Sequence, residues 1–250
     1  MIKKIYKQIV PEKVRNDIYI AKRKAKGLLL RGANFECNVC NSAFRKLLPK
    51  ADRLNAECPS CGALERTRLL LYYLQKETKI FKKRMKVLHF GPEPGLYAII
   101  SKADLEYVDA DYNAAYANHV IDITDIHYPD DYFDLIICSH VVGYVTDEDK
   151  ALEELYRVLS PDGMMLLLTF LNPESADTID HDWVNTRELR TIHYGEPDCL
   201  RLHGYNYKSV LESKGFKVNQ RDYRVELGEE RIKRNVLGEG PREDIFECTI

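Results

Sequence analysis

The stretch VLHFGPEPG at residues 87–95 decides how the chain is interpreted. Residues 86–90 are predicted to form a short, mostly apolar strand, and the glycines and prolines that follow predict a tight turn. A helix is expected next, at 96–102. A turn of this kind lets backbone N–H groups approach a ligand closely. Taken alone the stretch is weak support for a ligand site, because many strand–turn–helix joints contain glycine.

The chain beyond this stretch alternates between strand and helix patterns. We expect further strands at 106–110, 120–121, 133–138, 164–171, 216–223 and 244–250, and helices at 66–82, 147–159 and 207–214. The sequence SPDG at 160–163 is expected to end the helix before it. The continuous apolar run at 133–138 suits a strand buried on both faces. The alternation predicts an α/β fold with a Rossmann-like, mostly parallel, seven-stranded sheet and right-handed crossovers.

Two acidic residues stand where predicted strands end. Asp111 ends the second strand, twenty residues after Gly91. An acid at this place can bind ribose hydroxyls in a nucleotide-binding fold. Asp122 follows the third strand and can accept a hydrogen bond from an adenine amino group. Either aspartate alone is equally well explained as a turn residue, but their order along the chain favours a cofactor site.

These motifs together resemble the class I S-adenosylmethionine-dependent methyltransferases over about residues 86–222. The resemblance rests on LHFGPEPG (88–95), VDAD (108–111), DITDI (122–126), FDLIICSH (133–140) and RVLSPDG (157–163). It is nearest to a bacterial subgroup that has an N-terminal four-cysteine module and a Pro-Glu-Pro turn. It implies S-adenosylmethionine as cofactor.

The resemblance also implies roles for single residues. Gly91 and Gly95 would carry the methionine part of the cofactor, Asp111 the ribose, and Asp122 with Ile123 the adenine. The other residues expected at the cofactor are His89, Glu93, Tyr112 and Ser139.

The chain departs from the family pattern at the turn and after the fourth strand. Glu93 occupies the place of the middle glycine, and His89 replaces the usual acid. Gly143 and Tyr144 stand where Glu and His are frequent. These changes leave open a domain that has kept the fold and lost catalysis.

Three histidines are candidates for a general base: His140, His193 and His203. Imidazole suits proton transfer near pH 7, although an ordinary core or surface histidine is the commoner explanation for each of them. Residues 172–204 interrupt the alternation and are expected to cover the substrate site. Within them, 193–204 resembles a substrate-side segment of the same subgroup. Tyr194 and Tyr205 are candidates for orienting the substrate, and Arg201 for binding an anionic group.

Four cysteines form two C-x2-C pairs, Cys37 with Cys40 and Cys58 with Cys61, separated by seventeen residues. This spacing can place four thiolates around a tetrahedral zinc ion. Disulfides are disfavoured in a cytosolic protein, and a thioredoxin-like redox site needs one such pair. Four thiolates leave no open position for a catalytic water, so the zinc is expected to be structural. We expect a zinc ribbon-like module at 32–65.

The charge of the chain is uneven. Residues 1–31 contain ten Lys or Arg and two acidic residues, although the whole chain has a net charge of -2. This predicted helical arm is either a solvated surface or a contact with a membrane or another anionic surface. The methyltransferase domain would then span 66–250. No apolar run suits a membrane span or a secretory signal, and the cytoplasm is the expected location.

The expected function is S-adenosylmethionine-dependent methyl transfer. Members of the subgroup are often linked to cell-envelope or surface-glycan synthesis, so the resemblance implies a small-molecule or sugar acceptor. An RNA methyltransferase is the alternative, because some ribosomal-RNA methyltransferases also join a zinc module to this fold. The acidic body without a basic, aromatic stripe makes nucleic acid less favoured. A zinc-containing scaffold protein without catalysis is the alternative of another class.

Overall fold

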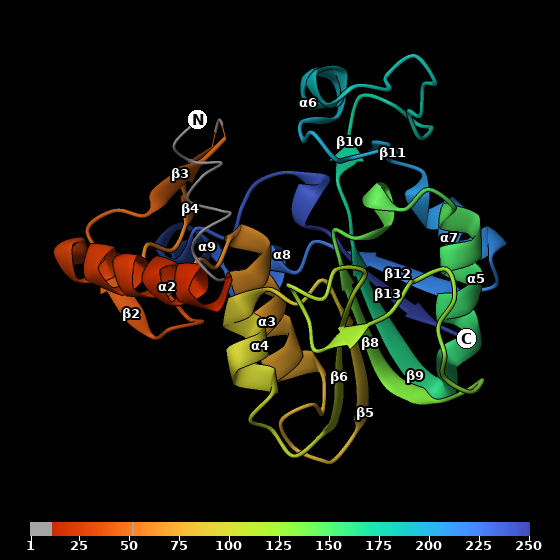
Figure 1. Cartoon of the computed structure of the whole chain (residues 1–250), viewed down its shortest axis with the longest axis horizontal. Helices are drawn as coiled ribbons and strands as arrows, with labels where there is room; N and C mark the ends of the chain where they lie inside the picture. Colours follow the sequence, from red (N-terminus) through yellow and green to blue (C-terminus); the bar gives the residue numbers. More distant parts are fainter. Residues whose placement is uncertain (1–11, 52) are drawn as a thin grey trace.

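The computed structural model describes residues 12–51 and 53–250, and its centre is a seven-stranded sheet (Figure 1). The strand order is β7-β6-β5-β8-β9-β13-β12. β13 runs antiparallel to both of its neighbours, and the other strand pairs are parallel. The Rossmann-like, mostly parallel sheet predicted from the sequence is therefore confirmed. The strands span β5 Lys86–Phe90, β6 Glu106–Asp111, β7 His119–Val120, β8 Phe133–Ser139, β9 Leu159–Leu168, β12 Lys217–Arg221 and β13 Ile245–Thr249.

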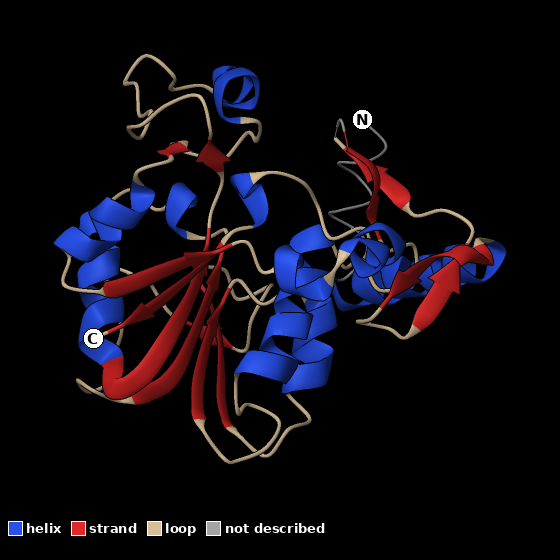
Figure 2. Cartoon of the chain, turned by 180° about the vertical axis from the view of Figure 1, so that it is seen from behind, coloured by secondary structure: helices blue, strands red, loops and turns tan. Residues whose placement is uncertain are grey.

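Helices cover both faces of this sheet, as the views from the front and from behind show (Figures 1 and 2). Alternate residues of β5 belong to two different cores. Leu88 and Phe90 pack with α5 (Glu148–Val158) and α7 (Tyr207–Ser213), whereas Val87 packs with α3 (Glu65–Glu77) and α4 (Pro94–Ile100). Burial on both faces explains why β5 and β8 are apolar almost throughout.

The helix before residues 160–163 ends at Val158, as expected, but two other element boundaries are wrong. The strand expected to begin at residue 164 begins at Leu159, so residues 160–163 belong to β9, which follows α5 directly. A Cβ on Gly163 would lie 2.9 Å from the carbonyl oxygen of Phe133, so this glycine serves close strand packing. Gly27 does not end a helix, because α2 (Glu12–Leu29) continues past it. A Cβ there would lie 2.9 Å from that of Ser60, so Gly27 lets α2 approach the second cysteine pair. Residues 1–11 of the predicted helical arm lie outside the described residues.

The cysteine module consists of two small antiparallel hairpins beside α2. β1 (Arg31–Cys37) pairs with β2 (Ser42–Phe44), and β3 (Leu48–Lys50) pairs with β4 (Arg53–Glu57). Each hairpin leads to one cysteine pair. The Arg23 side chain on α2 bonds the Glu57 carboxylate and the Cys58 carbonyl, which joins the helix to the module.

The segment between β12 and β13 carries elements that the sequence pattern did not predict. They are α8 (Arg224–Leu227), α9 (Glu229–Asn235) and the 3-10 turn η2 (Pro241–Glu243). α9 returns to the cysteine module, where Arg234 pairs with Glu36 at 2.6 Å. The buried Arg68 guanidinium donates to the carbonyls of Asn235 and Val236 and also to Ala56 and Ala63. The Arg68 side chain on α3 therefore links the cysteine module and the segment between β12 and β13 through buried hydrogen bonds.

Residues 172–204 rise above the carboxyl edge of the sheet (Figure 1). They contain the helix α6 (Arg187–Tyr194), and at the base of the segment β10 (Leu171–Asn172) pairs in parallel with β11 (His203–Gly204). Among the described helices, none is long and apolar enough to cross a membrane.

Candidate cofactor and acceptor site

A cavity of about 750 Å³ opens at the carboxyl ends of β5, β6, β7 and β8. The sheet order reverses between β5 and β8, the place where open α/β sheets bind ligands. The volume lies within the range of about 300–1,000 Å³ typical of small-molecule sites. Of the residues predicted from the sequence, the lining includes Gly91, Glu93, Asp111, Tyr112, Asp122, Ile123, Ser139 and His140.

Gly91 makes the turn after β5 possible. Its φ of 59° is in the left-handed region that favours glycine. A Cβ there would also lie 3.0 Å from Cγ2 of Val141, across the cavity wall. Glu93 has an ordinary φ of -65° and caps α4, so this turn does not require a glycine at that position. The departure from the family pattern at Glu93 is therefore compatible with the backbone of the turn.

The Glu93 side chain faces the guanidinium of Arg66 and the imidazole of His89. Its Oε1 lies 3.4 Å from Nε of Arg66, and its Oε2 lies 3.8 Å from Nε2 of His89. Burial alone would raise the pKa of Glu93, but His89 and Arg66 hold it below the ordinary value. His89 is fully buried beneath the turn, where its Nδ1 lies 2.9 Å from the Tyr107 hydroxyl. His89 thus supports Glu93 from below and does not line the cavity.

The two aspartates line the cavity at the carboxyl ends of β6 and β7. Asp111 is half-buried at the end of β6, and its Oδ1 accepts the backbone N–H of Asn113 at 2.8 Å. Asp122 is exposed, and its Oδ1 accepts from the backbone and hydroxyl of Thr124. Each carboxylate is thereby fixed by one oxygen through a local turn. The exposed Tyr112 side chain lines the cavity beside Asp111.

Ser139 and His140 end β8 with unused polar atoms. The Ser139 hydroxyl and both ring nitrogens of His140 are buried and have no hydrogen-bond partner among the described residues. Buried polar groups are normally paired, so these atoms have capacity for a bound molecule. His140 also has a φ of 54°, which is uncommon outside glycine and clusters at functional sites.

The charge state of His140 follows from its surroundings. Burial lowers its pKa well below the ordinary value, and the positive charges of Arg66, Arg242 and Arg53 lower it further. The imidazole is therefore neutral at pH 7, so one of its two ring nitrogens can accept a hydrogen bond. Its ring packs edge-on against Phe170, with the centroids 4.3 Å apart.

The other two candidate histidines lie outside the cavity lining. His203 is buried, with Nδ1 2.7 Å from the Thr169 hydroxyl and Nε2 2.8 Å from Oε1 of Glu148. Both of its nitrogens are thus engaged within the protein. His193 is exposed on α6 and packs against Trp183.

The expected substrate residues are also placed away from the cavity lining. Arg201 is buried and bonds Asp180 and the carbonyls of Val142, Val145 and Thr146. This arrangement favours a structural role that holds the loop after β8. Tyr194 is buried and its hydroxyl accepts from the backbone of His181, whereas Tyr205 is exposed.

Sequence reasoning missed nine of the lining residues, among them Arg66, Tyr144 and Thr146. Arg66 and Tyr144 line the cavity near His140, and Thr146 lies further along the same loop. Tyr144 stands at a position where this chain departs from the family pattern, and this departure could have indicated a residue of the site. A single arginine after the cysteine module carries no such signal.

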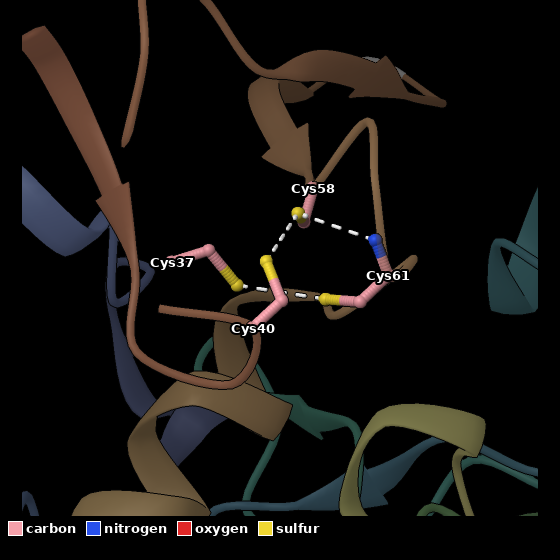
Figure 3. Close-up of side chains that lie close together, drawn as sticks. All are labelled: Cys37, Cys40, Cys58 and Cys61. Carbon is pink, nitrogen blue, oxygen red and sulfur yellow. Dashed lines mark hydrogen bonds between the residues drawn. The ribbon is translucent and has the colours of Figure 1, made fainter. Parts of the chain in front are cut away.

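The four cysteines of the module converge on one point (Figure 3). Their sulfur atoms all lie within 4.8 Å of one another, with Cys37 and Cys61 at 3.6 Å and Cys40 and Cys58 at 3.7 Å. Zn–S bonds of about 2.3 Å in a tetrahedron require sulfurs about 3.8 Å apart. The donor set and the spacing therefore fit a structural zinc ion with four cysteine ligands.

The module touches the cofactor turn directly. A Cβ on Gly95 would lie 2.7 Å from Cγ1 of Val39, the residue between the first two cysteines. Gly95 is therefore required for packing against the module, and it lies outside the cavity lining. The first cysteine loop therefore packs against the start of α4, directly after the turn at Gly91.

Comparison with known proteins agrees with this geometry. Residues 97–167 match the profile of a family described as a methyltransferase domain. Residues 97–167 therefore have the sequence pattern of a methyltransferase domain. A ubiquinone/menaquinone biosynthesis C-methyltransferase, UbiE of Vibrio vulnificus, is 49% identical over 49 residues, which are 20% of this chain and 19% of that protein. The matched residues thus span about a fifth of the length of the curated relatives.

Two solved structures are similar to this chain. The cyclase SpnF covers 82% of this chain and 85% of its own, with a TM-score of 0.50 and 11% identity. A SAM dependent methyltransferase from Archaeoglobus fulgidus covers 76% of this chain and 95% of its own, with a TM-score of 0.49 and 19% identity. SpnF is named for a cyclisation, so the fold of the methyltransferase domain does not by itself fix the reaction.

Proposed function

We propose that this chain transfers a methyl group from S-adenosylmethionine to a small-molecule acceptor, for which a sugar of cell-envelope or surface-glycan synthesis is our candidate. The observation that carries the proposal is the cavity at the carboxyl ends of β5, β6 and β8 in a chain with a methyltransferase domain. The sugar acceptor comes from the resemblance to the bacterial subgroup described above.

The residues of the cavity divide between cofactor and acceptor. The bound cofactor supplies a methyl group activated by its sulfonium. Gly91, Asp111, Asp122 and Ser139 would hold and orient the cofactor. Transfer needs the acceptor atom aligned behind the methyl carbon, and it needs water excluded. His140 is our candidate for receiving the acceptor's proton through one of its unpaired ring nitrogens.

Binding of S-adenosylhomocysteine to zinc-replete protein tests the proposal. Calorimetry should show saturable binding that Asp111→Ala weakens at least about tenfold. Asp104→Ala, on an exposed carboxylate outside the cavity lining, is the matched control and should bind normally. At a hundredfold excess over the dissociation constant, the ligand should stabilise the fold by about 2.7 kcal/mol. Absence of binding to the wild type would leave a non-catalytic scaffold as the better interpretation.

We further propose that the enzyme works in the cytoplasm. All seven cysteines are free thiols, and the two C-x2-C pairs need reduced sulfur to hold zinc.

We also propose that the helix α2 contacts an anionic surface. Lys22, Lys24 and Lys26 are exposed there beside the exposed Leu28 and Leu29. Equal binding to anionic and zwitterionic phospholipid vesicles would reject this contact.

A further inference from the structure

Three arginines from distant parts of the chain converge at the His140 end of the cavity. Arg66 begins α3 and lines the cavity, Arg242 lies in η2, and Arg53 lies in β4 of the cysteine module. The guanidinium of Arg242 sits 4.4 Å above the Phe170 ring, which packs edge-on against His140. All three charges act on His140.

Arg66 and Arg242 have acidic neighbours but poor pairing, whereas Nη1 of Arg53 lies 2.7 Å from Oε2 of Glu65. Nε of Arg66 lies 3.4 Å from Glu93, and Nε of Arg242 lies 3.7 Å from Glu243. Strong arginine–carboxylate pairs are bidentate, at about 2.7–2.9 Å. Arg157 shows such a pair in this molecule, since Nε and Nη2 each lie 2.8 Å from an oxygen of Glu154.

Unused donors remain on two of these guanidinium groups. Apart from the contact with Glu93, the Arg66 side chain makes no hydrogen bond within the described part of the chain. Nε of Arg242 is buried without a hydrogen-bond partner among the same residues. Burial raises the pKa of Glu243 to about 7, so near neutral pH its carboxyl compensates Arg242 only in part. In contrast, the buried Arg68 uses all of its nitrogens on backbone carbonyls.

We infer that Arg66 and Arg242, with Arg53 behind them, form an oxyanion subsite, and that the methyl acceptor carries a phosphate or carboxylate group. This inference rests on the proposed function, because it assigns the acceptor side of the same cavity. The planar guanidinium fork matches either group. The unpaired imidazole of His140 and the Tyr144 side chain line the cavity at the same end. An anion held there would offset the positive charges that face His140.

The subsite is tested with inorganic phosphate and, separately, acetate on the full-length, zinc-replete chain saturated with S-adenosylhomocysteine. Phosphate binding is followed by phosphorus NMR and acetate binding by proton NMR. Arg66→Gln and Arg242→Gln should each raise the dissociation constant at least about tenfold, as expected for a lost charge-assisted hydrogen bond. Arg84→Gln is the matched control, since Arg84 is exposed and its nearest acidic oxygen is 4.0 Å away. It should change the constant less than twofold.

Melting curves show whether each variant is folded, and Arg242→Lys provides a second test because it keeps the charge. It should retain more affinity than Arg242→Gln. Unchanged binding in Arg66→Gln and Arg242→Gln, or no binding of either ion to the wild type, would overturn the subsite. The stronger of the two ions identifies the acceptor group. Cofactor binding is measured in the same samples without either ion, so a failure of the methyltransferase proposal is seen separately.

Discussion

His140 combines three features that are rarely found in one residue. Its backbone is left-handed, its ring is buried, and neither ring nitrogen is paired within the described residues. A left-handed conformation costs a residue other than glycine about 1–2 kcal/mol. A fold retains such a cost where function requires it. The residue therefore merits the first mutation.

We expect His140→Ala to lower turnover by about a hundredfold, because a positioned general base contributes at least that much. The affinity for S-adenosylhomocysteine should change less than threefold, since the predicted cofactor contacts lie elsewhere on the lining. Steady-state kinetics and calorimetry measure the two quantities. His193→Ala on exposed α6 is the control. Equal turnover in the two variants would exclude His140 as the base.

Glu243 gives a prediction for stability and pH. Its folded pKa of about 7 lies above the ordinary 4.5, so the folded state holds this proton more tightly than the unfolded state. The stability from this group is fully present below about pH 4.5 and is lost as pH rises through 7.

Glu243→Gln keeps the neutral form at every pH. Its advantage in unfolding free energy should be small at pH 5 and grow to about 3 kcal/mol at pH 8.5. Urea unfolding at the two pH values measures this difference. Glu239→Gln is the control, because Glu239 is exposed, and its effect on the unfolding free energy should not change with pH. A constant difference between the variant and the wild type would contradict the cause assigned here.

At the scale of elements, long periodic patterns predicted the fold well. The apolar runs that became β5 and β8 are buried on both faces, so the local sequence records their surroundings. The segment 224–243 was not predicted because α9, EERIKRN, is mostly charged. Its helix depends on contacts with β1 and α3, which lie far away in the sequence. Tertiary contacts of this kind leave little local pattern.

The sequence motifs predicted part of the cavity lining. Motif order indicated Gly91, Asp111 and His140, all of which line the cavity. The arginines near His140 were not predicted, because Arg53, Arg66 and Arg242 lie far apart in the sequence and form no motif of regular spacing. Gly95 was assigned to the cofactor, and only the packing shows that Val39 occupies the space next to it.

At the scale of the whole molecule, the cysteine module and the cofactor cavity are mechanically joined through Val39 and Gly95. We expect one equivalent of zinc per chain. Removing it with a chelator should unfold the module, because four close thiolates repel one another without a metal. The affinity for S-adenosylhomocysteine should then fall at least about tenfold, since the turn loses its support.

Metal content, melting temperature and calorimetry measure these effects. Cys58→Ser should reproduce them. Cys199→Ser is the matched control, because Cys199 is a buried cysteine outside the cluster whose bond to the Arg201 carbonyl a serine can keep. Retention of full cofactor affinity in the zinc-free chain would refute the mechanical link.

The bonds from Arg68 to Asn235 and Val236 have a consequence for synthesis of the chain. Asn235 follows Arg68 by 167 residues. At about 5–20 residues per second a ribosome needs roughly 10–30 s to cover that distance. During this time Arg68, which is buried in the finished fold, lacks two of the four backbone carbonyls that accept its hydrogen bonds, because Asn235 and Val236 have not yet been synthesised. The cysteine module emerges before the segment that completes its hydrogen bonds, so it reaches its final packing late in synthesis.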